Sequence, residues 1–227
     1  PADNIEIGFP GEIIHKDLQI RTVDMSNMPS AIAGAKLEQM MGIRNSVKNS
    51  GSTTVMARLT HARLFGSDSP YEHRSHEELQ QEMAEIRQKH EHEDNHFLFE
   101  KNMTQVQLVV TNQGENVIEE ASLSLVLPAH DSFNVASHLP KRPRNDSFVQ
   151  RTPTEQAGYP SVTIKEDAIH VSSNLGELLP DVPMQAFEVP LRVCVGRDLK
   201  GRKLGIRYSL FGSNLQRAAK GQLRLLF

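Results

Sequence analysis

Residues 121–128 read ASLSLVLP, and this stretch decides the fold that the sequence predicts. Its alanine and leucines alternate with serines, so the apolar side chains fall on one face of an extended strand. Pro128 ends the run, as expected for a residue without a backbone N–H. A strand with one apolar face needs a second layer to cover it, so the stretch indicates a sheet that packs against another sheet.

The same two-residue period recurs along the C-terminal half of the chain. Further alternating runs occupy residues 105–110, 162–164, 169–171, 187–195, 204–210 and 223–227. In the run 187–195 the apolar set is expected to face the core, while Glu188, Pro190, Arg192 and Cys194 face away, and Pro190 favours an edge strand. Seven or so strands of this kind predict a sandwich of two antiparallel sheets over residues 96–227.

Three motifs in this region carry a resemblance. A strand ends in VTNQG within residues 109–114, the run ASLSLVLP follows, and LGELLP occupies residues 175–180. In this order they resemble bacterial immunoglobulin-like domains over about residues 100–227. The paired cysteines and buried tryptophan of antibody domains are absent from the sequence, so the resemblance implies the sandwich architecture alone.

The first part of the chain reads differently. Short alternating runs at residues 5–9, 18–22 and 53–64 predict strands, and residues 29–41 predict a helix that starts at Pro29 and stops at Gly42. Residues 1–66 are therefore expected to form a small α+β segment. A second likeness lies at its end, where RLFGS (63–67) followed by SHEEL (75–79) is similar to the end of Schlafen-type nucleic-acid-binding domains.

An acidic polar helix is predicted to connect the two parts over residues 67–95. Ser75 and Glu78 have the spacing of a capping box. Leu79, Met83 and Ile86 then form a narrow apolar stripe, which is expected to contact a larger body or a second copy of the chain. Residues 67–102 carry ten acids and four bases. The predicted class is thus α+β, with a short α/β and helical N-terminal portion followed by an immunoglobulin-like sandwich.

Composition bounds the setting of the protein. The 227 residues carry a net charge of -3 and no apolar run long enough for a membrane helix. Cys194 has no second cysteine to pair with, which favours a reducing compartment, so we expect a cytoplasmic protein, of bacterial type. The sequence starts at Pro1, which leads us to expect a piece of a longer protein.

The end of the chain is basic, with nine bases and one acid in residues 192–227. This segment suggests an alternative function, in which the chain is part of a nucleic-acid-directed effector that neutralises phosphates. The predicted contacts are Arg197, Lys200, Arg202, Lys203, Arg207, Arg217 and Lys220, to which the loop bases Lys141, Arg142, Arg144 and Arg151 could add. Charged strand edges that prevent aggregation explain the same composition without a ligand.

Three histidines and three carboxylates crowd into residues 90–96. Imidazole and carboxylate groups are zinc ligands, so a metal-dependent enzyme is a second alternative. On a helix His92 and His96 share a face, whereas His90 lies on another, and the HExxH motif is absent. The competing interpretation is a solvated helix end.

Catalysis finds little other support. The sequence contains no P-loop, no dinucleotide-binding glycine motif and no nucleophile elbow. Cys194 falls inside a predicted strand, where a packed thiol is expected, and the adjacent Glu119 and Glu120 should point to opposite faces. We therefore predict a non-catalytic interaction or assembly module, without a cofactor, that serves a larger protein or complex through a protein partner or self-association.

Overall fold

A computed structural model describes residues 4–49, 75–140 and 157–227. The chain divides into two compact units, one formed by Pro1–Met25 with Asn95–Phe227 and the other by Ser26–Asp94. The strands are β1 (Ile5–Gly8), β2 (Asp17–Gln19), β3 (Thr22–Val23), β4 (Thr104–Val106), β5 (Val109–Asn112), β6 (Ile118–Pro128), β7 (Phe133–Val135), β8 (Ser161–Ile164), β9 (Ala168–Leu178), β10 (Met184–Gln185), β11 (Leu191–Gly196), β12 (Lys203–Phe211) and β13 (Ala219–Leu226). The helices are α1 (Pro29–Asn49) and α3 (His76–His96), with short helical turns η2 (Met25–Asn27), η4 (Phe97–Lys101) and η5 (Arg197–Leu199).

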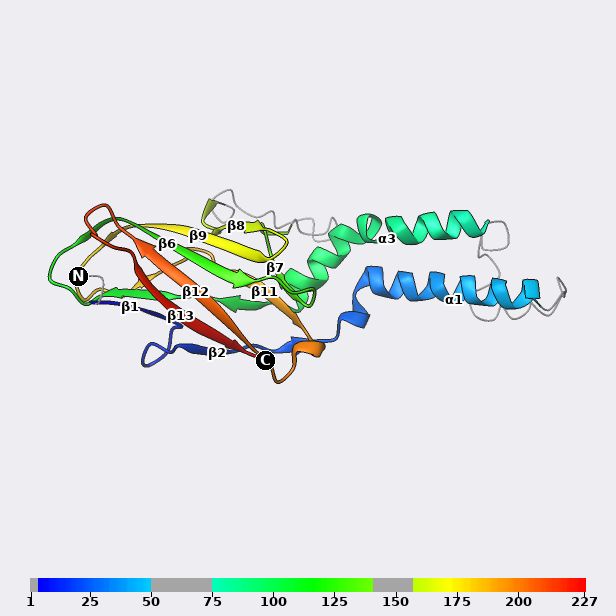
Figure 1. Ribbon diagram of the computed structural model, residues 1–227, viewed down its shortest axis with the longest axis horizontal. Coiled ribbons are helices and arrows are strands. Elements are labelled where there is room, and N and C mark those ends of the chain that lie inside the picture. The colour runs from blue at the N-terminus through cyan, green and yellow to red at the C-terminus, as the bar shows by residue number, and fades with distance from the viewer. Residues whose placement is uncertain (1–3, 50–74, 141–156) are drawn as a thin grey trace, which may run out of the picture. The chain divides into compact units, whose positions relative to one another are not determined.

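One layer of the first unit is a six-stranded sheet with the order β2-β13-β12-β6-β9-β8 (Figure 1). Its strands pair antiparallel, except that β2 runs parallel to β13. β6 lies in the middle and contains the stretch 121–128. Ala121, Leu123, Leu125 and Leu127 are buried, while Ser122 and Ser124 stay partly exposed, which confirms the predicted alternation.

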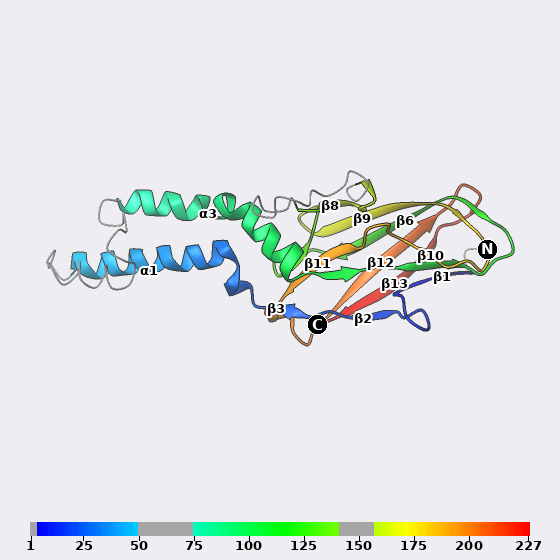
Figure 2. The same cartoon turned by 180° about the vertical axis from the view of Figure 1, so that it is seen from behind.

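The other layer consists of two short sheets, β1-β5-β10 and β3-β11-β4, with β7 also paired to β11 (Figure 2). The predicted strand 105–110 is divided between them as β4 and β5. Gln107 lies at the division, where its side-chain amide donates to Phe187 O at 2.6 Å and its Oε1 accepts from Phe187 N at 3.2 Å. The side chain thus replaces the strand pairing that is interrupted there.

β11 differs from the prediction for residues 187–195. The strand begins at Leu191, and all six of its residues are buried, including Arg192 and Cys194, which were expected to face away. The prediction was wrong because the face of β11 expected to be exposed is covered by η4, a π-helical turn that contacts the strand, and Arg192 Nη1 donates to Phe99 O in that turn at 2.8 Å. Pro190 precedes the strand and therefore interrupts no pairing.

The first 25 residues belong to the sandwich. β1 pairs with β5, β2 with β13 and β3 with β11, so the structure divides the chain differently from the predicted segment 1–66. These partners lie far away in the sequence, and a local pattern carries no information about them. The predicted strand 53–64 and the motif 63–67 lie outside the described residues.

The second unit is built on α1 and α3, which run antiparallel beside each other in both views (Figure 1, Figure 2). Leu37, Leu79 and Ile86 form their buried contact. The capping box is confirmed, since Glu78 N donates to Ser75 Oγ at 3.1 Å and Ser75 N donates to the Glu78 carboxylate.

A carboxylate from one helix caps the other. Asp94, near the end of α3, accepts a hydrogen bond from Ser30 N in the first turn of α1 at 2.9 Å. An anion is favourable at a helix N-terminus, where backbone N–H groups lack partners within the helix. This contact ties the start of α1 to the end of α3.

The α+β class and the β-sandwich are confirmed, and the immunoglobulin-like assignment of the strands stays a prediction. The sandwich encloses one large apolar cluster to which both sheets contribute. None of the described helices combines the length and the apolar character that a membrane crossing requires.

Candidate functional site

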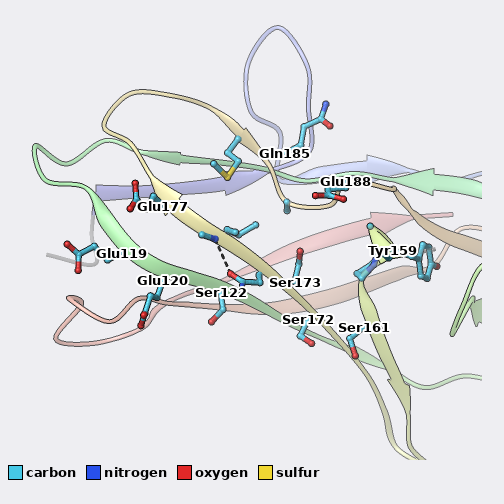
Figure 3. A pocket seen from close by; sticks show the side chains of 18 residues that line it. Glu119, Glu120, Ser122, Tyr159, Ser161, Ser172, Ser173, Glu177, Gln185 and Glu188 are labelled. Carbon is cyan, nitrogen blue, oxygen red and sulfur yellow. Dashed lines mark hydrogen bonds between the residues drawn. The ribbon is translucent and has the colours of Figure 1, made fainter. Parts of the chain in front are cut away.

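A groove of about 1120 Å³ lies on one side of the sandwich, between β9 of one sheet and β10 of another (Figure 3). Residues of β6, β9 and the segment that leads into β8 form one wall, and β10 with the residues that follow it forms the other. The polar residues that line it are Glu119, Glu120, Ser122, Tyr159, Ser161, Ser172, Ser173, Asn174, Glu177, Gln185 and Glu188. The groove lies wholly within the sandwich unit.

The two walls are edges of two different sheets. β8 pairs with β9 from Ser161 opposite Ser172 to Ile164 opposite Ile169. Beyond this ladder, residues 173–178 of β9 pair with β6 and with no further strand among the described residues. β10 is likewise the last strand of its sheet. Edge strands present backbone donors and acceptors to an incoming chain.

The phase of the β8–β9 ladder shows which backbone groups face the groove. Lys165 N donates to Ala168 O at 2.9 Å, which makes these residues a hydrogen-bonded pair. Because such pairs alternate along an antiparallel ladder, the backbone groups of Ser172 also point toward β8. Asn174 is the next residue in this series, and its backbone groups point away from β6 beyond the end of β8.

Two irregularities in the β6–β9 pairing shape the end of the groove. The register shifts between Ile118 and Ala121 and again between Ala121 and Ser122. Glu120 has a φ of 48°, in the left-handed region that non-glycine residues rarely adopt, and Gly176 has a φ of 72°. Such bulges redirect side chains that a regular strand would alternate.

Two of the lining glutamates lie in the irregular part of β6. Glu119 and Glu120 fall between Ile118 and Ala121, where the register shifts, and both line the groove. That their side chains point to opposite faces stays a prediction. Figure 3 shows them with Glu177 near one end of the groove, and Glu188 further along, close to Gln185.

Among the described residues that line the groove, four carry carboxylates, Glu119, Glu120, Glu177 and Glu188, and none is a lysine, arginine or histidine. Glu188 approaches the opposite wall so closely that a Cβ added to Gly158 would lie 2.9 Å from its Cβ. Within the described ranges, none of these carboxylates forms an ion pair. The described lining is therefore negatively charged.

The groove brings hydroxyl and carboxylate groups together. Histidine and lysine, frequent bases beside a serine nucleophile, are absent from the described lining, which leaves its glutamates as the available bases. The Tyr159 hydroxyl is committed to the fold, because it donates to Ala136 O at 3.0 Å and accepts from Arg192 N at 3.2 Å. Burial raises the pKa of Tyr159, so the phenol stays protonated.

The predicted nucleic-acid contacts are spread along the sheet. Lys203 begins β12, while Lys220 on β13 lies opposite Ser209, six residues further along, which is about 20 Å. Arg197 donates to Asp24 Oδ2 at 3.0 Å. The other predicted bases, Lys200, Arg202, Arg207 and Arg217, are exposed. The loop bases Lys141, Arg142, Arg144 and Arg151 lie outside the described residues.

The predicted metal ligands His92 and His96 lie one turn apart near the end of α3. His90 contacts Glu93, with 2.5 Å between Nδ1 and Oε2. No grouping of three or more potential ligands that could hold a metal ion occurs in residues 4–49, 75–140 and 157–227. A divalent metal at this place stays a prediction.

The predicted interface stripe contacts a helix of the same chain. Leu79 and Ile86 are buried against Leu37 of α1, and Met83 packs at the margin of this contact. Self-association through the stripe stays a prediction. Cys194 is buried and free, and burial raises its thiol pKa to about 11, in agreement with the packed thiol expected from the sequence.

The sequence did not indicate the groove, because its glutamates come from three separate segments of the chain. One local signal was present: Gly176 interrupts an otherwise alternating run, and a glycine inside a strand often marks a bulge. No local signal pairs Glu188 with the wall that contains Gly158.

No protein-family model and no curated protein matches the sequence. Among solved structures, the chain is similar to a non-cellulosomal cohesin from the archaeon Archaeoglobus fulgidus, with 12% identity over 56% of this chain and 82% of that chain and a TM-score of 0.30. It is also similar to a collagen-binding subdomain of the Enterococcus faecalis surface protein ACE, with 12% identity over 53% of this chain and 85% of that chain and a TM-score of 0.24. A third similar structure is the collagen-binding domain of a Staphylococcus aureus adhesin, with 9% identity over 55% of this chain and 89% of that chain and a TM-score of 0.26. At these values the likeness assigns no family.

Proposed function

We propose that this chain is a non-catalytic interaction module whose sandwich binds a segment of a partner protein in the groove between β9 and β10. The observation that carries the proposal is the groove itself, which is walled by the exposed edges of two sheets. Edge strands with unpaired backbone groups are a recurrent means of capturing an extended peptide.

The chemistry of the lining supports binding. The hydroxyl, amide and carboxylate groups of the groove can hydrogen-bond to the backbone and the side chains of a peptide. A groove of about 1120 Å³ also exceeds the usual size of a small-molecule pocket. An extended polypeptide fits such a volume.

A blocking substitution tests the proposal. Ser173 lines the groove, and tyrosine at this position would fill part of it. Ser209 lies on the outer face of the same sheet, on β12, two strands away from β9, and does not line the groove, so Ser209→Tyr is the matched control. Random peptides displayed on phage are selected on the unmodified chain, and the enriched peptides are measured against both variants by fluorescence anisotropy.

We expect Ser173→Tyr to weaken binding of the enriched peptides at least about tenfold and Ser209→Tyr to leave it unchanged. Circular dichroism melts of both variants check that each is folded. If the enriched peptides bind Ser173→Tyr as tightly as the unmodified chain, the groove is not the binding site. Loss of binding with Ser209→Tyr instead would place the partner on the outer face of the sheet.

A further inference from the structure

The charge of the groove narrows the class of partner, and this inference rests on the function proposed above. We infer that the groove takes an extended segment of a partner protein whose lysine or arginine side chains pair with Glu177 and Glu188. The two glutamates come from opposite walls, one on β9 and the other beyond β10. A basic segment lying between the walls therefore passes both carboxylates.

Charge complementarity favours this occupant over the alternatives. The four glutamates among the described lining residues carry negative charge, and no lysine, arginine or histidine in this part of the lining offsets them. An acidic peptide or a nucleic acid would meet repulsion from every charged group. A sugar would lack a stacking platform, because Tyr159 is the aromatic residue of the lining and its ring is partly buried.

Backbone geometry favours an extended conformation of the segment. An incoming strand that continues the line of β8 meets the backbone N–H and C=O of Asn174, which face away from β6. Beyond Asn174 the bulge at Leu175 and Gly176 ends the regular edge, so strand pairing stops there. The segment then depends on side-chain contacts, and in an extended chain every second side chain faces the same wall.

The probe is a short fluorescein-labelled peptide in which lysine alternates with threonine. One control is the same peptide with glutamine in place of lysine. The other is the lysine peptide with N-methylated backbone amides at its lysine positions. Glu177→Gln combined with Glu188→Gln removes the two carboxylates while keeping side-chain size. Glu12→Gln combined with Glu166→Gln is the matched control, because both residues are exposed and neither lines the groove.

We expect the lysine peptide to bind about fivefold more weakly to the Glu177/Glu188 variant and unchanged to the Glu12/Glu166 variant, since exposed charge pairs each contribute modestly. The glutamine peptide should bind weakly to all of them. The N-methylated peptide should also lose affinity, because it cannot donate backbone hydrogen bonds to the sheet edge. Raising the salt from about 50 mM to about 500 mM should weaken binding of the lysine peptide.

Equal binding of the lysine peptide to both double variants, or equal binding of the lysine and glutamine peptides, would overturn the inference. Failure of this inference can be told apart from failure of the proposed function by comparing the Ser173→Tyr variant with the Glu177/Glu188 variant. Peptides that respond to Ser173→Tyr but not to removal of Glu177 and Glu188 show a groove that binds without charge selection. Peptides that respond to neither refute both.

Discussion

Replacing Arg192 with methionine removes a buried guanidinium from the centre of β11. Its Nη1 donates to Phe99 O at 2.8 Å and to Glu100 Oε1 at 2.5 Å, and the Arg192 and Glu100 side chains are only 10% and 20% exposed. Each hydrogen bond to a charged group contributes about 1.5–3 kcal/mol, and the substitution also leaves the Glu100 carboxylate without this partner. We expect the free energy of unfolding to fall by about 3–5 kcal/mol.

The measurement is urea unfolding followed by circular dichroism, with linear extrapolation to water. Arg197→Met is the matched control, because Arg197 also forms an ion pair, with Asp24, but its side chain is 67% exposed. That substitution should cost less than about 1 kcal/mol. In the double variant Arg192→Met/Glu100→Gln the charge that loses Arg192 is removed as well, so the cost should be smaller than the sum of the two single variants by about 1–3 kcal/mol.

Two results would refute this reasoning. If Arg192→Met costs no more than Arg197→Met, burial of the pair has no energetic consequence. If the double variant costs as much as the two single variants together, Arg192 and Glu100 do not interact, and the guanidinium contributes through its other contacts, among them the one to Phe99 O.

Three further predictions follow from other contacts. Because burial raises the pKa of Cys194 to about 11, roughly one thiol in a thousand is ionised at about pH 8, so a thiol reagent should label the native protein far more slowly than the urea-unfolded chain; equal rates would show an accessible thiol. Asp94→Ala removes the acceptor for Ser30 N and should lower the stability of the helical unit by about 1–2 kcal/mol in thermal melts of the helical circular dichroism signal, whereas Asp94→Asn, which keeps an acceptor, should cost less; equal losses would contradict a capping role. The hydrogen bond from Ser132 Oγ lowers the pKa of Asp198 in the folded protein. Asp198 therefore stabilises the fold at pH values above its pKa in the unfolded chain, and this contribution is lost as pH falls through its lowered pKa in the folded protein. Ser132→Ala should raise the pKa of Asp198 in an NMR titration, and an unchanged pKa would exclude this cause.

The two-residue period predicted β6 correctly because one face of the strand is buried and the other is partly exposed. The leucines of residues 121–128 face the apolar interior, while the serines face outward. The same reasoning failed for β11, where Arg192 and Cys194 are as buried as the valines. A strand covered on both faces has no exposed side to which the polar residues could alternate.

The groove shows the same limit for function. Glu119 and Glu120 were visible as neighbours in the sequence, and both lie where the register of β6 against β9 shifts. Glu177 and Glu188 add to them from other segments. The sequence alone therefore predicted separate carboxylates, and the packing of distant segments brought them to one groove.

By itself the sequence determined the alternation of β6, where α3 is capped by Ser75 and Glu78, and that a sandwich follows residue 96, because these features depend on neighbours within a few positions. The predicted helix stop at Gly42 was wrong, since α1 continues to Asn49. Tertiary structure alone decided that the first 25 residues join the sandwich, that Arg192 is buried against Glu100, and that four glutamates line one groove. Each of these depends on which distant segments pair with each other, and pairing energy comes from burial and backbone hydrogen bonds that no single segment encodes.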